Sequence, residues 1–137
     1  MAVDRVGPDK VRGPRKVLFD SSFLIAAMEH PTPWQHDIVG CLGRFDGVVL
    51  HPVRAELERL AGAGGRRSSY ARLALQLVDQ GALRFEASGR GRADDELVSH
   101  ALRDGAAVAT IDGVLIGQLR ASHVEVVSLR SGRVALV

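Results

Sequence analysis

The 137-residue chain contains little cysteine, lysine or aromatic side chain, and each shortage excludes a class of function. Its single cysteine, Cys41, excludes a disulfide framework and any multi-cysteine zinc or iron–sulfur site. Lysine occurs only at Lys10 and Lys16, which excludes a P-loop, a Schiff-base mechanism and a receiver domain in the rest of the chain. No apolar run reaches the roughly 18 residues of a membrane helix, and residues 1–15 lack the apolar centre of a signal peptide. We therefore expect a cytoplasmic protein with no membrane partner.

The composition is that of one globular domain. Apolar residues make up 46% of the chain and charged residues 25%, and 18 basic residues stand against 16 acidic ones. Residues 1–15 are polar, rich in Gly and Pro, and show no periodicity, which predicts a flexible basic arm. The remainder, residues 16–137, forms the predicted domain.

Short apolar runs alternate with amphipathic segments along this domain. The runs predict buried strands over 17–19, 48–50, 82–85, 106–109 and 124–127, and a Ser-Gly turn predicts a terminal hairpin over 129–134. Helices are expected over about 23–28, 33–42, 52–61, 66–80, 94–104 and 112–120. This alternation predicts an α/β fold, a three-layer α/β/α sandwich with a mostly parallel central sheet.

Helical spacing also predicts which side chains face the core. In the fourth helix the apolar stripe contains Tyr70, Leu73, Ala74, Leu77 and Val78, and in the fifth it contains Leu97, Val98, Ala101 and Leu102. Cys41 lies on the stripe of the second helix and is expected to be buried. The four phenylalanines, including Phe85, are expected in the core.

Four carboxylates fall where the predicted strands end or where the adjoining helices begin. Asp20 follows the first strand directly, Glu56 lies one turn into the helix after the second, and Asp112 follows the fourth. Asp94 opens the helix before that fourth strand, and helical spacing turns it and Asp112 inward. Ligands of such sheets bind at the carboxyl ends of the strands. The four acids are therefore candidates for a common site.

Converging carboxylates repel one another unless a cation lies among them. Oxygen ligands alone suit Mg²⁺ or Mn²⁺, and one or two such ions could activate water and stabilise displacement at a phosphodiester. The alternative is structural, because Asp20, Asp94 and Asp112 each also stand where a helix N-cap is expected.

Four segments resemble, in order and spacing, the acidic motifs of PIN-domain nucleases: residues 17–24, 53–57, 93–98 and 108–112. The resemblance implies an α/β/α sandwich with Mg²⁺- or Mn²⁺-dependent endoribonuclease activity, leaving 5′-phosphate and 3′-hydroxyl ends. It implies that Asp20, Glu56, Asp94 and Asp112 are the catalytic, metal-binding acids, supported by Ser22, Thr110 and Asp95. Ser22 stands where the family usually has Asn, and it can still donate a hydrogen bond to Asp20. The segment after Asp112 looks more like the ribosomal-RNA-processing branch than the toxin branch.

Arginines concentrate around the middle of the chain and suit bidentate contact with phosphate. The candidates for RNA binding are Arg54, Arg66, Arg67, Arg90 and Arg92. Among the few aromatics, only Trp34 and Tyr70 are candidates for stacking on bases, so base-specific contact with single strands has little support. The five histidines show no i, i+4 pair, which argues against a zinc site.

Three functions remain open on this fold. The first is an RNA-processing endoribonuclease, with RNA and ribosome-assembly proteins as partners. The second is a toxin ribonuclease restrained by an antitoxin, and the third is a non-catalytic RNA-binding assembly factor. The family resemblance also allows a homodimer. A dinucleotide-binding domain is disfavoured because Asp20, Ser21 and Ser22 stand where a glycine-rich turn would follow the first strand.

Overall fold

The computed structural model describes residues 13–137. The strands are β1 (Arg15–Phe19), β2 (Phe45–Leu50), β3 (Arg84–Glu86), β4 (Ala107–Ala109), β5 (Val126–Arg130) and β6 (Arg133–Leu136). The helices are α2 (Ser21–Glu29), α3 (Trp34–Leu42), α4 (His51–Gly62), α5 (Arg66–Asp79), α6 (Ala93–Asp104) and α7 (Gly113–Ala121). The predicted alternation of strands and helices is therefore confirmed.

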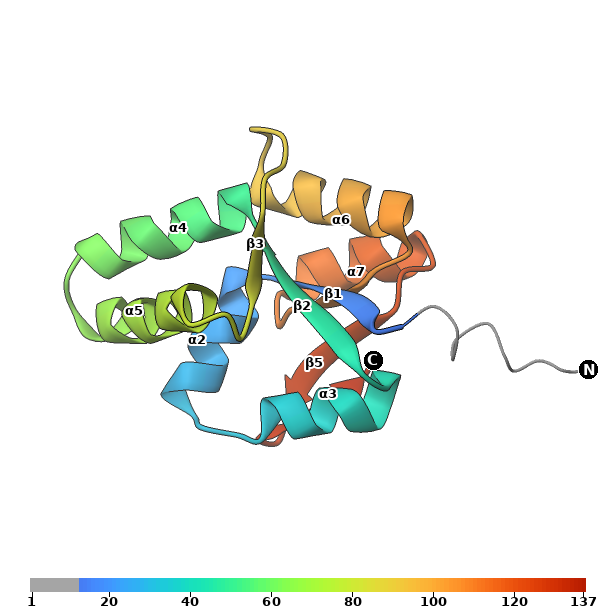
Figure 1. Cartoon of the computed structure of the whole chain (residues 1–137), viewed down its shortest axis with the longest axis horizontal. Helices are drawn as coiled ribbons and strands as arrows, with labels where there is room; N and C mark the ends of the chain where they lie inside the picture. Colours follow the sequence, from blue (N-terminus) through green and yellow to red (C-terminus); the bar gives the residue numbers. More distant parts are fainter. Residues whose placement is uncertain (1–12) are drawn as a thin grey trace, which may run out of the picture.

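The strands form one sheet in the order β3-β2-β1-β4-β5-β6. All neighbours pair in parallel except β5 and β6, which form an antiparallel hairpin. Figure 1 shows α6 and α7 together on one side of the sheet, with α2, α3, α4 and α5 on the other. The fold class, an α/β sandwich with a mostly parallel central sheet, is confirmed.

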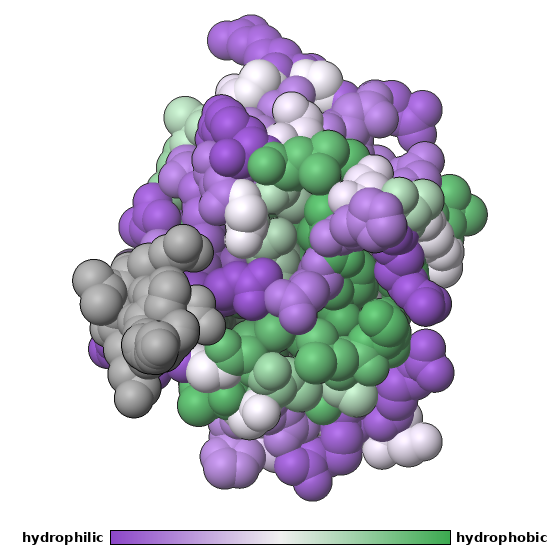
Figure 2. All heavy atoms as spheres, turned by 90° about the vertical axis from the view of Figure 1, so that its right-hand side faces the viewer, coloured by the Kyte–Doolittle hydropathy of each residue, from purple (hydrophilic) through white to green (hydrophobic). Residues whose placement is uncertain are grey.

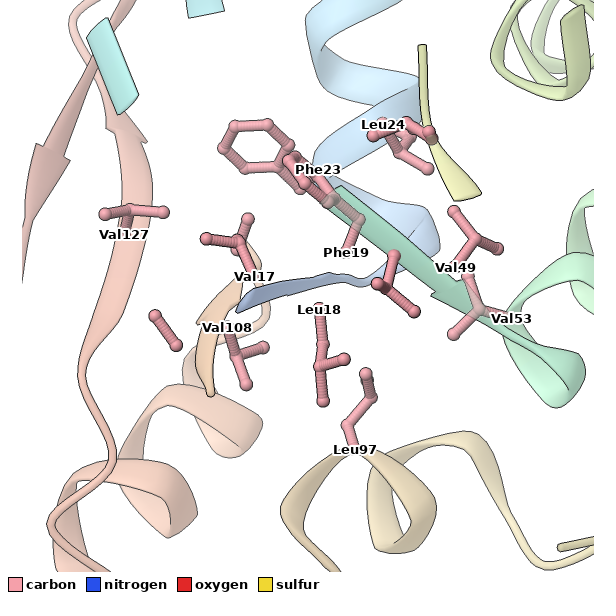
Figure 3. Packing of buried hydrophobic residues seen from close by; sticks show 14 of the residues in the cluster. Val17, Leu18, Phe19, Phe23, Leu24, Val49, Val53, Leu97, Val108 and Val127 are labelled. Carbon is pink, nitrogen blue, oxygen red and sulfur yellow. The ribbon is translucent and has the colours of Figure 1, made fainter. Parts of the chain in front are cut away.

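Strand β1 lies in the middle of the sheet and contributes side chains to both apolar layers. Its residues from Val17 to Phe19 are fully buried, which explains why this strand is a continuous apolar run. In Figure 3, Leu18 points with Val108 toward Leu97 of α6, whereas Phe19 points toward α2. Burial on both faces fixes the position of β1 and of the residue that follows it, Asp20.

Two predicted helix faces are confirmed only in part, because Ala74 of α5 and both Leu97 and Ala101 of α6 are buried as expected while one large residue of each face is exposed. In α5 the buried residues are Ser68, Ala71 and Ala74, whereas Leu73 is 44% exposed. Small residues face α4 because the two helices lie close together, and the Ser68 hydroxyl donates a 2.6 Å hydrogen bond to the Ala61 carbonyl. In α6 the buried face includes His100, and Leu102 is 55% exposed.

Several element ends also differ from the prediction. β1 begins at Arg15, inside the predicted arm, and the arm's residues 1–12 lie outside the described part of the chain. β3 covers Arg84–Glu86, two residues beyond the predicted start. Phe85 belongs to this edge strand and is 40% exposed, so its assignment to the core is wrong. Cys41 is half-buried.

Hydrophobic residues also gather on one face of the molecule. Figure 2 looks onto the side at which β1 begins and shows a hydrophobic area bordered by hydrophilic residues. Exposed apolar area of this kind often marks a contact surface for another molecule. Across residues 13–137, no helix has the length and apolar character needed to cross a membrane.

The terminal hairpin is attached to the domain by a buried carboxylate that the sequence did not single out. Asp37 of α3 accepts hydrogen bonds from the Arg133 guanidinium at 2.5 and 2.8 Å and from the Val134 amide at 3.0 Å. These hydrogen bonds lower the pKa of Asp37 to about 2, and those from Arg133 have the largest effect. The ionised form is therefore the one that stabilises the fold.

We expect this carboxylate to contribute to acid unfolding in a defined pH window. Because the pKa of Asp37 is lower in the folded chain, its contribution is complete above about pH 4, the unfolded value, and is lost as the pH falls toward 2. Urea midpoints measured from pH 6 to pH 2 should fall less steeply below pH 4 in Asp37→Asn than in the wild type. Parallel curves for the two proteins would contradict this assignment.

Candidate functional site

Asp20 lies at the carboxyl end of β1 and is 5% exposed. Its amide donates to the Ala109 carbonyl of the neighbouring strand at 2.9 Å. Its Oδ2 accepts two hydrogen bonds, from the Ser22 hydroxyl at 2.6 Å and the Thr110 hydroxyl at 2.7 Å. Although Asp20 occupies the N-cap position of α2, its side chain makes no capping bond, so its carboxylate is not committed to the helix.

Two successive amides complete this hydrogen-bonded group. The Ile111 amide donates to the Ser22 hydroxyl at 3.3 Å, and the Asp112 amide donates to the Thr110 hydroxyl at 3.1 Å. Thr110 is fully buried, as a residue directly after the buried strand β4 should be. Ser22 and Thr110, both predicted as supporting residues, thus hold Asp20 in one orientation.

Asp112 and Glu56 are oriented by their own contacts. Asp112 caps α7, because its Oδ1 accepts from the amides of Val114 at 2.9 Å and Leu115 at 3.2 Å. Glu56 Oε1 accepts a 2.9 Å hydrogen bond from the Ser21 hydroxyl. Ser21 is buried, and sequence reasoning did not assign it to the site, although its position directly after Asp20 places it at the same edge.

Asp94 and Asp95 lie in the first turn of α6, which follows an N-cap at Arg92. Burial raises the pKa of Asp94, and the nearby charges of Asp20 and Asp112 raise it further. Arg92 opposes this rise. Asp95 is exposed. Thr110 links Asp20 and Asp112 by hydrogen bonds, and the effect of both acids on the pKa of Asp94 agrees with a common location at the carboxyl edge of the sheet.

Little positive charge compensates these acids. Within residues 13–137, neither Asp20, Asp94 nor Asp112 forms an ion pair with Lys or Arg. Glu56 lies 3.8 Å from Arg59, at the exposed surface. An uncompensated group of oxygen ligands at a partly open edge fits a hard divalent cation. The donor chemistry of the four acids therefore suits Mg²⁺ or Mn²⁺.

A tighter group of metal-type ligands lies elsewhere, in residues that sequence reasoning did not select. This group consists of Glu86, His100 and Asp104, each of which has a potential ligand atom within 4.8 Å of the other two. It is the one such group among residues 13–137. The Lys16 ammonium group already supplies positive charge to these carboxylates. It donates hydrogen bonds to Glu86 at 2.8 and 3.1 Å and to Asp104 at 2.7 Å. We interpret this group as an ion-pair network that ties β1 to β3 and α6. Among the described residues, no three of the four predicted acids form a group as tight as this one.

The five candidate arginines lie in three places. Arg90 and Arg92 are exposed in the loop before α6, beside Asp94. Arg66 and Arg67 are exposed at the start of α5, and Arg66 lies 3.9 Å from Glu29. Arg54, on α4, lies over the ring of Phe85. The structure therefore does not gather all five arginines into one patch.

The aromatic candidates require a correction. Trp34 is only 7% exposed and packs edge-on against Phe19, with ring centroids 5.5 Å apart, so it is a core residue and cannot stack on a base. Tyr70 is half-buried and packs against the core. The exposed aromatic that sequence reasoning missed is Phe85. The signal that could have identified it is its place in a very short strand, which is typical of a sheet edge.

A mostly apolar cavity of about 370 Å³ opens beside the site. Ile111 lies in its wall and links it to the group around Asp20, since the Ile111 amide donates to Ser22. The other lining residues come from α2, the loop after it and the terminal hairpin: Ala26, His30, Thr32, Leu129 and Gly132.

Comparison with known proteins agrees with this fold. A family profile described as "PIN like domain" matches residues 17–132. Among solved structures, the PIN domain endonuclease Utp24 superposes with a TM-score of 0.75 at 21% identity, covering 90% of this chain and 91% of that one. VapBC-1 from nontypeable Haemophilus influenzae superposes with a TM-score of 0.59 at 15% identity, covering 81% of this chain and 96% of that one. No curated protein matches the chain by sequence.

Proposed function

The chain belongs to the PIN-like domain family, and from this premise we propose that it is a metal-dependent endoribonuclease. One observation carries the proposal. The charges of Asp20 and Asp112 raise the pKa of Asp94 at the carboxyl edge of the sheet, Arg92 only partly opposes this rise, and none of the three acids forms an ion pair with Lys or Arg among residues 13–137. A structural site would relieve this repulsion with Lys or Arg, as Lys16 does for Glu86 and Asp104. The acids instead form a set of ligands that calls for a cation.

Asp20, Glu56, Asp94 and Asp112 would hold one or two Mg²⁺ or Mn²⁺ ions. When bound, such an ion activates water and stabilises negative charge on a phosphodiester. Ser22 and Thr110 fix the orientation of the Asp20 carboxylate, and Ser21 does the same for Glu56. Arg90 and Arg92, beside Asp94, would bind backbone phosphates of the RNA and position the scissile bond.

We infer RNA processing in the cytoplasm as the biological role, with products that carry 5′-phosphate and 3′-hydroxyl ends. The similarity in fold to a PIN domain endonuclease supports endonucleolytic cleavage. The hydrophobic area of Figure 2 would bind a protein partner, either a second copy of the chain or ribosome-assembly proteins. Such a partner would leave the acidic edge open to RNA.

The purified chain should cleave RNA only in the presence of a divalent cation. Labelled single-stranded and structured RNAs are incubated with Mg²⁺, with Mn²⁺ or with EDTA, and the product ends are identified by their susceptibility to phosphatase. We expect internal cuts with either ion and none in EDTA, because four carboxylates without a cation repel a phosphate. Restoring Mn²⁺ after chelation should restore cleavage.

Two outcomes would contradict the proposal. Full activity in EDTA would exclude the metal mechanism. RNA binding without cleavage at any concentration of either ion would indicate the non-catalytic assembly factor instead.

A further inference from the structure

Three side chains form a partly exposed aromatic and cationic cluster near the acidic edge: His51 and Arg54 of α4 and Phe85 of β3. The rings of His51 and Phe85 meet edge to face, with centroids 6.3 Å apart and an interplanar angle of 72°. The Arg54 guanidinium carbon lies 5.7 Å from the centre of the Phe85 ring. Phe85 nevertheless remains 40% exposed and His51 is exposed. We call these three residues the Phe85 platform.

The platform lies at the same edge of the sheet as the acids. His51 directly follows β2, as Asp20 directly follows β1, and parallel strands end at a common edge. Phe85 pairs with Val49 of β2, and the next strand along is β1. Two strand spacings make roughly 10 Å between the backbones of β3 and β1, and Phe85 shares the face of Val49, opposite to the face on which Leu18 points toward α6.

Two exposed carboxylates orient the guanidinium of this platform. Arg54 donates to Glu58 at 3.3 Å and to Asp79 at 3.4 Å. Both contacts are long, both acids are more than half exposed, and the Arg54 side chain is 28% exposed. A docking surface for a protein is expected to surround the ring with apolar residues. Here His51 and Arg54 instead place hydrogen-bond donors and positive charge beside the Phe85 ring, which favours RNA.

We propose that the Phe85 platform stacks one unpaired base of the RNA while Arg54 contacts the adjoining phosphate. The inference rests on the proposed function, since it assigns to the same site a preference for single-stranded RNA. Aromatic side chains bind unpaired bases without regard to sequence, because every base has a flat π face. A base within a duplex is already stacked and cannot use the platform.

Binding to RNA that cannot be cut tests this proposal. In an Asp20→Asn parent, the affinities for a labelled single-stranded oligonucleotide and for a blunt duplex of equal length are measured by fluorescence anisotropy. Phe85→Ala should weaken single-strand binding about 5- to 150-fold and leave duplex binding unchanged. Phe85→Trp should keep the parent's affinity for single-stranded RNA. Binding of this RNA should also quench the fluorescence of the new indole, and the quenching can be assigned to position 85 because Trp34 is buried.

Leu102→Ala serves as the matched control, because Leu102 is a large exposed apolar residue on α6. This variant should bind both RNAs like the parent. Unchanged single-strand binding by Phe85→Ala, or an equal loss for the duplex, would overturn the platform, as would an unquenched Phe85→Trp. If Phe85→Ala is unfolded by circular dichroism, His51→Ala and the quenching of Phe85→Trp decide the question.

The platform and the proposed function can fail separately. Wild-type cleavage together with normal binding by Phe85→Ala overturns the platform alone. A wild-type chain that neither cleaves nor binds RNA overturns both.

Discussion

Replacing Asp20 with asparagine is expected to lower the rate of RNA cleavage by about 10²–10³-fold while the fold is kept. The estimate is the usual effect of removing one group that stabilises charge in a transition state. Asp20 is the most buried of the four acids, and its orientation is fixed by the Ser22 and Thr110 hydroxyls. Asparagine keeps an oxygen that can accept these hydrogen bonds, so the loss reports the missing charge rather than a collapsed site.

Single-turnover cleavage measures this loss, and thermal unfolding of the same variant checks the fold. Removing one of three neighbouring negative charges should leave the melting temperature unchanged or raise it. It should also lower the raised pKa of Asp94, which NMR titration can follow, since Asp20 is one cause of that rise. Glu125→Gln serves as the control, because it removes an exposed carboxylate that is paired with Arg15, away from the four acids. This variant should cleave RNA at the wild-type rate. Cleavage by Asp20→Asn at the wild-type rate would remove Asp20 from the mechanism.

Replacing Phe19 with alanine is expected to lower the free energy of unfolding by about 3–5 kcal/mol. Phe19 is fully buried, and its ring contacts three others, with centroids 5.6 Å from Phe23, 5.5 Å from Trp34 and 6.2 Å from Phe45. The substitution therefore leaves a cavity bounded by rigid rings. Such a loss is a large part of the roughly 5–15 kcal/mol that stabilises an ordinary domain.

Urea denaturation followed by Trp34 fluorescence measures this change directly, because Trp34 is the chain's one tryptophan and lies against Phe19. Phe19→Leu, which retains most of the volume, should cost clearly less. A loss below about 1 kcal/mol for Phe19→Ala would mean that the neighbouring rings fill the space.

The sheet and the acids could be predicted because they depend on local sequence. β1 is apolar throughout since both of its faces are covered, and Asp20 follows it directly. The place of Asp94 in the first turn of α6, three residues before buried Leu97, follows from the same local pattern. These features require no knowledge of distant residues. The family resemblance rests on the same short segments.

The remaining features depend on residues far apart in sequence. Asp37 is paired with Arg133, 96 positions away, and Lys16 with Glu86, 70 positions away. Their partners are set by strand order, which no local pattern encodes. Phe85 was expected in the core together with the other phenylalanines, yet its strand lies at the edge of the sheet. Which strand lies at an edge is a property of the whole topology.

The hydrogen bonds around Asp20 have a fixed direction. Two main-chain amides, of Ile111 and Asp112, donate to the Ser22 and Thr110 hydroxyls, which leaves both hydroxyl hydrogens to point at Asp20 Oδ2. Reversing either hydroxyl would leave an amide facing a hydrogen. Asp20 Oδ2 therefore accepts both hydroxyl hydrogen bonds, whereas Oδ1 accepts none from residues 13–137, so the loop after β4 determines which oxygen of Asp20 stays available to a ligand.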